Sequence, residues 1–343
     1  MIKYGDTVFN FVKVVDYAKQ NSIQCRIFKN KFLKLDFISL KNVIFIDYSS
    51  ELCGQILMPQ PSNKKNIIIF EDSFVYDHNE DERLAILSKL LVNPTLTVLD
   101  EAVPLAHVWS YNFYHWTFEC LTKLLALEQI GYRGMYIVPN VKHVIEYLEI
   151  FNIKMDRVRF SDQPYFVRNM IIPPNFNGYQ LKNRKDIILY IRKKILDITG
   201  KLDGNKRVYV KRICNRRVTN ETEVIDILNK YDFDVLVPEN LSLSEQFKYM
   251  SNVDFSVMAH GANCTLTICQ KIKSKYIEFF NNDYVNYHML GVINALNLFY
   301  TPLVNTRLDH CAKNLKNTQS QQDDVIVPID TFEIVLHNLI KNS

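Results

Sequence analysis

The stretch Val253-Asp-Phe-Ser-Val-Met-Ala-His260-Gly261-Ala262-Asn263 decides the fold that we expect for this chain. Its first seven residues are mostly apolar and partly β-branched, which is typical of a short buried strand. A tight turn at Gly261 then leads into a segment with helical potential. A strand, a glycine turn and a helix start favour an anion site, because free backbone N–H groups and the positive end of the helix dipole meet there. A plain strand-to-helix connection has the same pattern, and one glycine does not separate the two interpretations.

Strands and helices alternate on both sides of this stretch. Apolar runs predict strands over 207–212, 234–237, 275–280 and 298–303, and helices over 184–199, 220–230, 242–250 and 284–296. Such alternation with short connections predicts a parallel, doubly wound sheet. Ligands of these sheets bind at the carboxyl ends of strands, which is where the His260 turn lies.

The first half of the chain alternates less regularly. Strands are predicted over 23–28, 43–47, 66–70, 74–76, 95–99, 135–139, 158–160 and 166–174, and helices over 8–20, 81–91 and 141–151. Pro173-Pro174 and Gly178 interrupt regular structure, so we place a domain boundary there. The first domain is then 1–178 and the second 179–328, and we expect the terminal helix 329–343 to pack back on the first domain.

Composition excludes several classes of partner. The 343 residues carry a net charge of only +4, which is too balanced for a nucleic-acid-binding surface. The seven cysteines are scattered and form no C-x-x-C pair, so neither a zinc-ligand set nor a disulfide framework is expected. Charged residues interrupt the N-terminal apolar run, and no window suits a transmembrane helix. We therefore expect a cytoplasmic protein, with peripheral membrane contact left open.

A histidine and a carboxylate form the main candidate site of the first half. Asn112 is a predicted helix N-cap, and His115 and Glu119 follow at an i, i+4 spacing that places them on one helix face. Such a pair can act in general acid/base catalysis, although it is also an ordinary surface pair. Tyr114 and Trp116 favour a lined pocket or cleft in which a sugar stacks.

Charge also gathers at the carboxyl end of the first strand of the second half. Lys211, Arg212, Arg216 and Arg217 form a basic loop whose guanidinium groups suit a diphosphate, with a solvated loop as the alternative. Glu278 lies near the end of a later strand and is predicted to accept the hydroxyls of a ribose, unless it is an edge residue that faces water.

Two acidic groups are set aside as metal sites. The acidic residues of 71–81 are more typical of a solvated turn before a helix. Asp232-Phe-Asp234 has a D-x-D form, but it lies at the amino end of a strand, where aspartate is common in turns.

Several of these motifs together resemble glycosyltransferase family 61. That family has an Arg-rich segment before Asn-Glu, a Pro-Glu-x-Leu-Ser-x-x-Glu-Gln segment, a His-Gly-Ala turn and an earlier Asn-Tyr-Tyr-His-Trp-Leu-x-Asp motif. In this chain the corresponding segments are Arg216-Arg217-Val-Thr-Asn220-Glu221, Pro238-Glu239-Asn-Leu241-Ser242-Leu-Ser-Glu245-Gln246, His260-Gly261-Ala262 and Asn112-Phe-Tyr-His115-Trp116-Thr-Phe-Glu119.

The resemblance implies a GT-B fold, in which two Rossmann-like, doubly wound α/β domains face each other across a cleft. It implies an inverting enzyme that moves a sugar from a nucleotide sugar, usually a UDP-sugar, to a glycan or glycolipid hydroxyl. Glu119 is expected to be the base with His115 beside it, and Asn112, Tyr114 and Trp116 to line the acceptor side. The expected donor contacts are Arg212, Arg217, His260, Gly261, Ala262, Asn263, Thr265 and Glu278. No motif requires a divalent metal or another cofactor.

The chain departs from the family pattern at three positions. Asn263 replaces a small residue, Leu266 stands where asparagine is frequent, and Glu119 replaces aspartate. These departures keep a second function open, that of a catalytically inactive module that binds a nucleotide or a glycan. A NAD-dependent oxidoreductase is disfavoured, because the chain has no G-x-G-x-x-G motif.

Overall fold

The computed structural model describes the backbone of 25–30, 35–46, 55–59 and 67–70, together with residues 97–106, 109–163, 165–173, 181–282, 284–305 and 324–341. The chain divides into two compact units, Met1–Asn177 and Gly178–Ser343. The predicted helices over 8–20 and 81–91, the strand over 74–76, the acidic group at 71–81 and the boundary at Gly178 lie outside the described residues.

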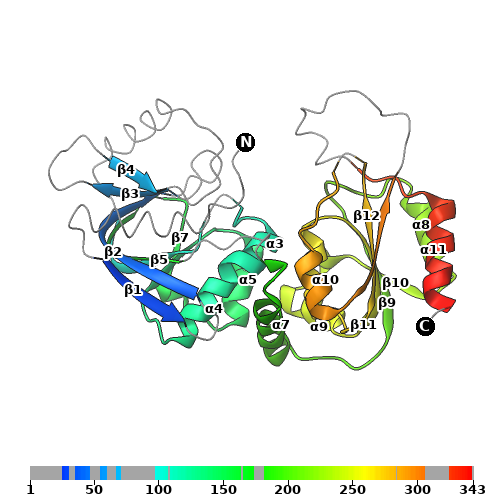
Figure 1. Ribbon diagram of the computed structural model, residues 1–343, viewed down its shortest axis with the longest axis horizontal. Helices are drawn as coiled ribbons and strands as arrows, with labels where there is room; N and C mark the ends of the chain where they lie inside the picture. Colours follow the sequence, from blue (N-terminus) through cyan, green and yellow to red (C-terminus); the bar gives the residue numbers. More distant parts are fainter. Residues whose placement is uncertain are drawn as a thin grey trace. The chain divides into compact units, whose positions relative to one another are not determined.

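The first unit is built on a mixed sheet (Figure 1). Its strand order is β4 (Ile67–Phe70), β3 (Gln55–Pro59), β2 (Leu35–Ile46), β8 (Tyr165–Ile172), β5 (Thr97–Pro104), β6 (Met135–Val138) and β7 (Val158–Phe160), with β1 (Cys25–Asn30) also paired to β2. The strands from β8 to β7 are parallel to one another, as predicted. The strands β1 to β4 are antiparallel, and β2 joins β8 antiparallel, so the predicted doubly wound sheet is wrong for this half.

The helices of the first unit follow its parallel strands. A continuous helical run follows β5 and comprises α3 (Phe113–His115), a π-helical turn η1 (Trp116–Cys120) and α4 (Leu121–Gln129). The helix α5 (Lys142–Ile150) follows β6, and the short η2 (Met155–Arg157) precedes β7. The run is anchored by fully buried apolar side chains of η1 and α4, which is why an apolar sequence forms a helix at this place.

The second unit contains a five-stranded sheet that is entirely parallel. Its order is β10 (Phe233–Leu236), β9 (Lys206–Val210), β11 (Val253–Ala259), β12 (Lys275–Phe280) and β13 (Phe299–Val304). The chain first moves outward from β9 to β10 and then crosses back to the other side of β9. The order of the strands therefore reverses between β9 and β11, and such a switch point is where sheets of this type bind ligands.

Helices cover both faces of this second sheet, as the predicted doubly wound arrangement requires (Figure 1). The helices are α7 (Lys185–Thr199), α8 (Glu221–Asn229), α9 (Leu243–Met250), α10 (Leu290–Leu296) and α11 (Ile329–Lys341), with short 3-10 helices η3 (Pro238–Asn240) and η4 (Ala262–Cys269). The predicted capping box of Ser242 and Glu245 starts α9. The expectation that the terminal helix packs on the first domain is wrong, because Phe332 and Leu336 of α11 belong to the core of the second unit.

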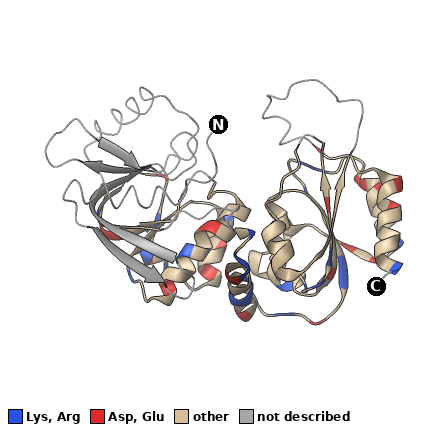
Figure 2. Ribbon diagram, viewed as in Figure 1, with Lys and Arg blue, Asp and Glu red and all other residues tan. Residues whose placement is uncertain are grey.

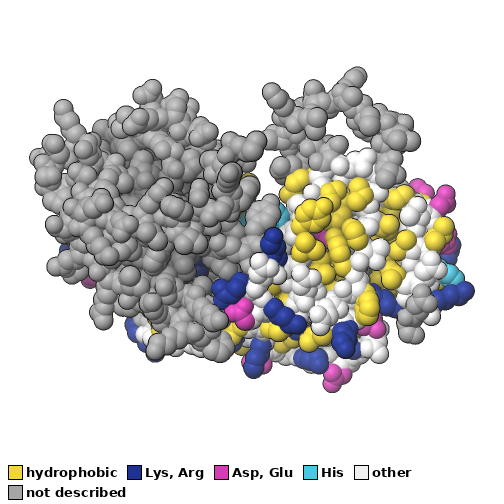
Figure 3. Space-filling model, in the orientation of Figure 1, with side chains coloured by type: hydrophobic (Ala, Val, Ile, Leu, Met, Phe, Trp, Pro, Cys, Tyr) yellow, Lys and Arg dark blue, Asp and Glu magenta, His cyan; other side chains and the backbone are white. Residues whose placement is uncertain are grey.

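Charge and polarity follow this layered arrangement. In the second unit charged side chains lie mainly on the helices and near strand ends, and the middle of the strands is mostly uncharged (Figure 2). Apolar side chains gather on one face of the same unit (Figure 3), and its exposed large apolar residues include Tyr287 and Phe299. Within the described residues, no helix combines the length and the apolar character needed to cross a membrane.

Candidate functional site

The first group of candidate residues lies at the start of the helical run after β5. Asn112 has an extended backbone and caps α3, because its Oδ1 accepts a hydrogen bond from the Tyr114 amide at 2.9 Å. This confirms the predicted N-cap. The run then widens into the π turn η1, a feature that occurs often at functional sites.

The predicted pairing of His115 with Glu119 is present. The imidazole Nδ1 lies 2.9 Å from Glu119 Oε1. The His115 side chain is 17% exposed, whereas that of Glu119 is only 2% exposed. The buried carboxylate therefore orients the ring and can stabilise its protonated form, while the ring is the member of the pair that reaches solvent.

Aromatic rings surround His115, although not all of those that were predicted. Trp109 stacks on the imidazole with a centroid distance of 5.8 Å, and Tyr114 meets its edge at 5.2 Å. Tyr114 is mostly buried. The assignment of Trp116 to a cleft is wrong, because its side chain is fully buried in the core of the first unit. Trp109, which the sequence did not single out, is 37% exposed.

The second group lies at the switch point of the second sheet. His260 directly follows β11, and its amide donates to the Phe279 carbonyl at 2.9 Å. Gly261 follows with φ 156° and ψ −169°, a combination that is essentially restricted to glycine. A Cβ atom at this position would overlap with the guanidinium of Arg212. The backbone conformation thus favours glycine, and a larger residue would also displace the arginine side chain that lies against it.

Two arginines of the basic loop turn towards this point. Arg212 is buried, with only 9% of its surface exposed. Its Nε donates a hydrogen bond to the Asn215 carbonyl at 2.9 Å. Arg216 has a left-handed backbone with φ 63°, and its guanidinium lies over the Tyr284 ring at 5.4 Å. Burial lowers the pKa of Arg216, and the charge of Arg212 lowers it further. The two cations are therefore close enough to repel each other.

Three buried polar atoms at this edge have no hydrogen-bond partner among the described residues: Arg212 Nη1, Arg216 Nε and Thr265 Oγ1. Buried polar groups are normally paired, so these unpaired atoms are candidates for contact with water or with a bound group that is not part of the chain. Guanidinium donors select an anion with several oxygens. Ala262 and Asn263 begin η4 beside them and are partly exposed.

The predicted role of Arg217 does not match its position. Its guanidinium lies 3.0 Å from Asp324 Oδ2, its amide donates to the same carboxylate, and its side chain is 60% exposed. Lys211 is likewise paired, with Glu221 at 2.5 Å. Arg216 is the residue of the loop that the sequence-based assignment missed. The pattern Arg216-Arg217 gave no means to tell which side chain turns inward.

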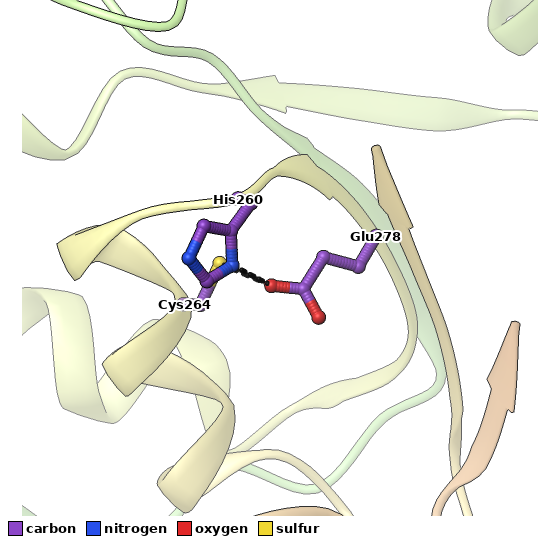
Figure 4. A group of neighbouring side chains, drawn as sticks. All are labelled: His260, Cys264 and Glu278. Carbon is purple, nitrogen blue, oxygen red and sulfur yellow. Dashed lines mark hydrogen bonds and ion pairs between the residues drawn. The ribbon is translucent and has the colours of Figure 1, made fainter. Parts of the chain in front are cut away.

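Glu278 is placed differently from the predicted ribose contact. Its side chain is 1% exposed, and His260 Nδ1 lies 2.5 Å from its Oε1 (Figure 4). Tyr300 donates to Oε2 at 2.9 Å, and the Cys264 thiol lies 3.5 Å from Oε1. Both carboxylate oxygens are therefore occupied by the protein, and Glu278 supports His260 from below the surface.

The comparison with known proteins concerns the region that holds most of these residues. Residues 113–277 match the family model described as Glycosyltransferase 61. The matched region contains His115, Glu119, both inward-facing arginines and the His260 turn, and it ends one residue before Glu278. No curated protein matches the chain.

Proposed function

We propose that this chain, whose residues 113–277 match the family model described as Glycosyltransferase 61, moves a hexosyl or pentosyl group from a UDP-sugar to a hydroxyl of a glycan or glycolipid. The proposed reaction is a single displacement that inverts the anomeric carbon. The observation that carries the proposal is the pair of inward-facing guanidinium groups at the switch point of the second sheet.

The donor diphosphate is assigned to Arg212 and Arg216. Each has a buried nitrogen without a partner among the described residues, and neither forms an ion pair with a carboxylate in that part of the chain. In a displacement of this kind, negative charge develops on the leaving diphosphate, and preorganised cations stabilise it. The arginines supply that charge in the proposed site without a divalent metal. Thr265 and the backbone after Gly261 complete the set of donors.

The proton of the acceptor hydroxyl is assigned to the His115–Glu119 pair. Glu119 was predicted to be the base itself, but it is almost fully buried, and His115 is the exposed member. We therefore assign the contact with the hydroxyl to the imidazole and the stabilisation of the imidazolium to Glu119. This division of roles follows the logic of histidine–carboxylate pairs in other enzymes.

Binding of UDP measured by calorimetry tests the donor assignment. Arg212→Ala and Arg216→Ala should each weaken UDP binding by about 1.5–3 kcal/mol, as expected for a lost charge-assisted hydrogen bond to phosphate. Arg217→Ala is the matched control, since it removes the same charge from the same loop at an exposed ion pair. It should change binding by less than about 0.5 kcal/mol.

Equal losses for all three variants would indicate a general effect of charge and contradict the assignment. A thermal-shift screen against nucleotide sugars then identifies the donor, because a ligand at 100 times its Kd adds about 2.7 kcal/mol of stability. UDP-sugar binding without transfer to any acceptor would favour the second candidate, an inactive binding module. The cytoplasmic location stays a prediction.

A further inference from the structure

His260, Cys264 and Glu278 form a buried cluster whose chemistry allows two roles, a metal site or a hydrogen-bond network. The three ligand atoms lie within 4.8 Å of one another and come from the end of β11, from η4 and from β12 (Figure 4). A histidine, a thiol and a carboxylate are all ligands of zinc. The same three groups can equally share protons in a buried hydrogen-bond network.

The distances favour the proton. Ligand atoms about 2.1 Å from a tetrahedral zinc ion are about 3.4 Å apart, whereas His260 Nδ1 and Glu278 Oε1 are separated by only 2.5 Å. That separation is a hydrogen-bond contact, shorter even than the roughly 2.7–2.9 Å typical of an N–H donor and a carboxylate. Burial raises the pKa of the Cys264 thiol, and the charge of Glu278 raises it further, so the thiol keeps its proton.

Asn286 determines which imidazole nitrogen carries the proton. Its amide nitrogen lies 2.8 Å from Nε2 of His260. The orientation of the amide is set by its own Oδ1, which accepts the His288 backbone N–H at 3.2 Å. An amide nitrogen can only donate, so Nε2 must accept and Nδ1 must carry the ring hydrogen. The histidine is therefore fixed as a neutral ring that donates to Glu278.

The same contact fastens a segment that completes the arginine site. Asn286 lies two residues after Tyr284, whose ring approaches the His260 ring at 5.6 Å and lies under the Arg216 guanidinium. The Tyr284 amide is held by Asn281 Oδ1 at 2.8 Å. On its other side His260 stacks on Phe280 at 4.8 Å. The His260 ring thus contacts the segment 284–288 at two residues, Tyr284 and Asn286.

We propose that Asn286 is a positioning residue of the donor site: it holds His260 as the Nδ1–H tautomer and, through it, holds Tyr284 beneath Arg216. The proposal rests on the proposed function, because it gives the arginine site its purpose. In this proposal Arg212 and Arg216 carry the positive charge that faces the diphosphate, and His260 carries no charge. His260, the most conspicuous residue of the turn, then acts through other residues.

Nuclear magnetic resonance of protein labelled with ¹⁵N-histidine tests the tautomer directly. In the wild type, the histidine whose resonances respond to Asn286 should show a protonated Nδ1 and an unprotonated Nε2. Asn286→Asp places a carboxylate at Nε2 and should convert the ring to imidazolium. Asn282→Asp adds the same charge just before this segment, at an exposed position, and should leave the ring unchanged.

Calorimetry with UDP tests the positioning. Asn286→Leu, which cannot donate to Nε2, should weaken UDP binding about fivefold, the effect of one lost hydrogen bond. Asn286→Gln keeps the amide and should recover part of that loss, which a purely steric role would not predict. Asn282→Leu should bind UDP as the wild type does.

Two results would overturn the proposal. A wild-type ring with its hydrogen on Nε2, or one whose resonances change on addition of one equivalent of Zn²⁺, would show that Asn286 does not fix the tautomer. Unchanged UDP affinity in Asn286→Leu would remove the positioning role. If the wild type shows the expected tautomer and binds no UDP, the proposed function fails while the tautomer assignment stands.

Discussion

The described part of the chain contains two histidine–glutamate pairs that make the same contact in different surroundings. In each pair the imidazole Nδ1 meets a glutamate Oε1, at 2.9 Å in His115–Glu119 and at 2.5 Å in His260–Glu278. The first pair spans one helical turn and leaves 17% of the histidine exposed, whereas the second joins two strands and leaves 8% exposed. A histidine with a carboxylate behind it is therefore not by itself a catalytic base. Whether the histidine can act as a base depends on its access to solvent and on the group that contacts its second ring nitrogen.

The largest difference between the pairs is expected in catalysis. His115→Ala should lower the rate of sugar transfer by about 10²–10⁴-fold, because it removes the group that takes the acceptor's proton. Binding of UDP should stay within about threefold, since the nucleotide is assigned to other residues. Steady-state transfer assays and calorimetry on the same preparation measure both quantities. Unchanged transfer would remove the first pair from the mechanism.

The second pair should instead control stability. His260→Ala leaves the buried Glu278 carboxylate without its closest partner, which should lower the free energy of unfolding by about 3 kcal/mol. The loss is at the low end for a broken buried pair, because Tyr300 and Cys264 still donate to the carboxylate. Urea denaturation measures the change. The control is Arg217→Ala, which breaks a partly exposed ion pair with Asp324 and should lose less than about 1 kcal/mol. An equal loss there would contradict the prediction.

A third histidine shows the effect of burial without a carboxylate. Burial lowers the pKa of His143 from its ordinary value of 6.5 to about 4, and its Nε2 has no partner among the described residues. Between pH 6.5 and 4 the unfolded chain binds a proton that the folded chain does not, so stability falls as the pH falls. The expected loss is about 2–3 kcal/mol over that window. Thermal unfolding of the wild type and of His143→Phe from pH 7 to pH 4 should diverge by this amount, and parallel curves would contradict it.

The smallest expected effect concerns the support of Glu278. Burial raises the pKa of Tyr300, and the Glu278 charge raises it further, so the phenol keeps its proton and donates. Tyr300→Phe removes one of several hydrogen bonds and should cost about 1 kcal/mol of stability. Tyr287→Phe, at a side chain that is 69% exposed, is the control with no expected change. Equal unfolding curves for both variants would show that Glu278 does not need this bond.

Much of the second sheet could be predicted from the sequence because its strands are continuous apolar runs. The predicted strands over 253–260 and 275–280 are β11 and β12. The i, i+4 spacing also predicted the contact between His115 and Glu119, since helix geometry is local. The first sheet was harder to predict, because charged residues such as Asp36 and Lys41 interrupt the apolar pattern of the long strand β2.

The errors at the site have physical causes that lie beyond local pattern. The left-handed backbone at Arg216 decides which arginine turns inward, and the neighbouring residues give no sequence signal for that conformation. Asn286 lies in a segment predicted as the helix 284–296, whereas α10 begins only at Leu290. The surroundings of Glu278 depend on His260 and Tyr300, which come from two neighbouring strands and their ends.

Because Arg212 lies so close to Gly261, substitutions at the two positions are expected to be coupled in evolution. Any side chain at 261 would occupy the volume of the guanidinium. In a lineage that acquires alanine there, the guanidinium of Arg212 has to move away from the turn, which weakens its place in the site. The glycine of the turn and the arginine of a distant loop are therefore expected to be kept together or lost together among descendants of this chain.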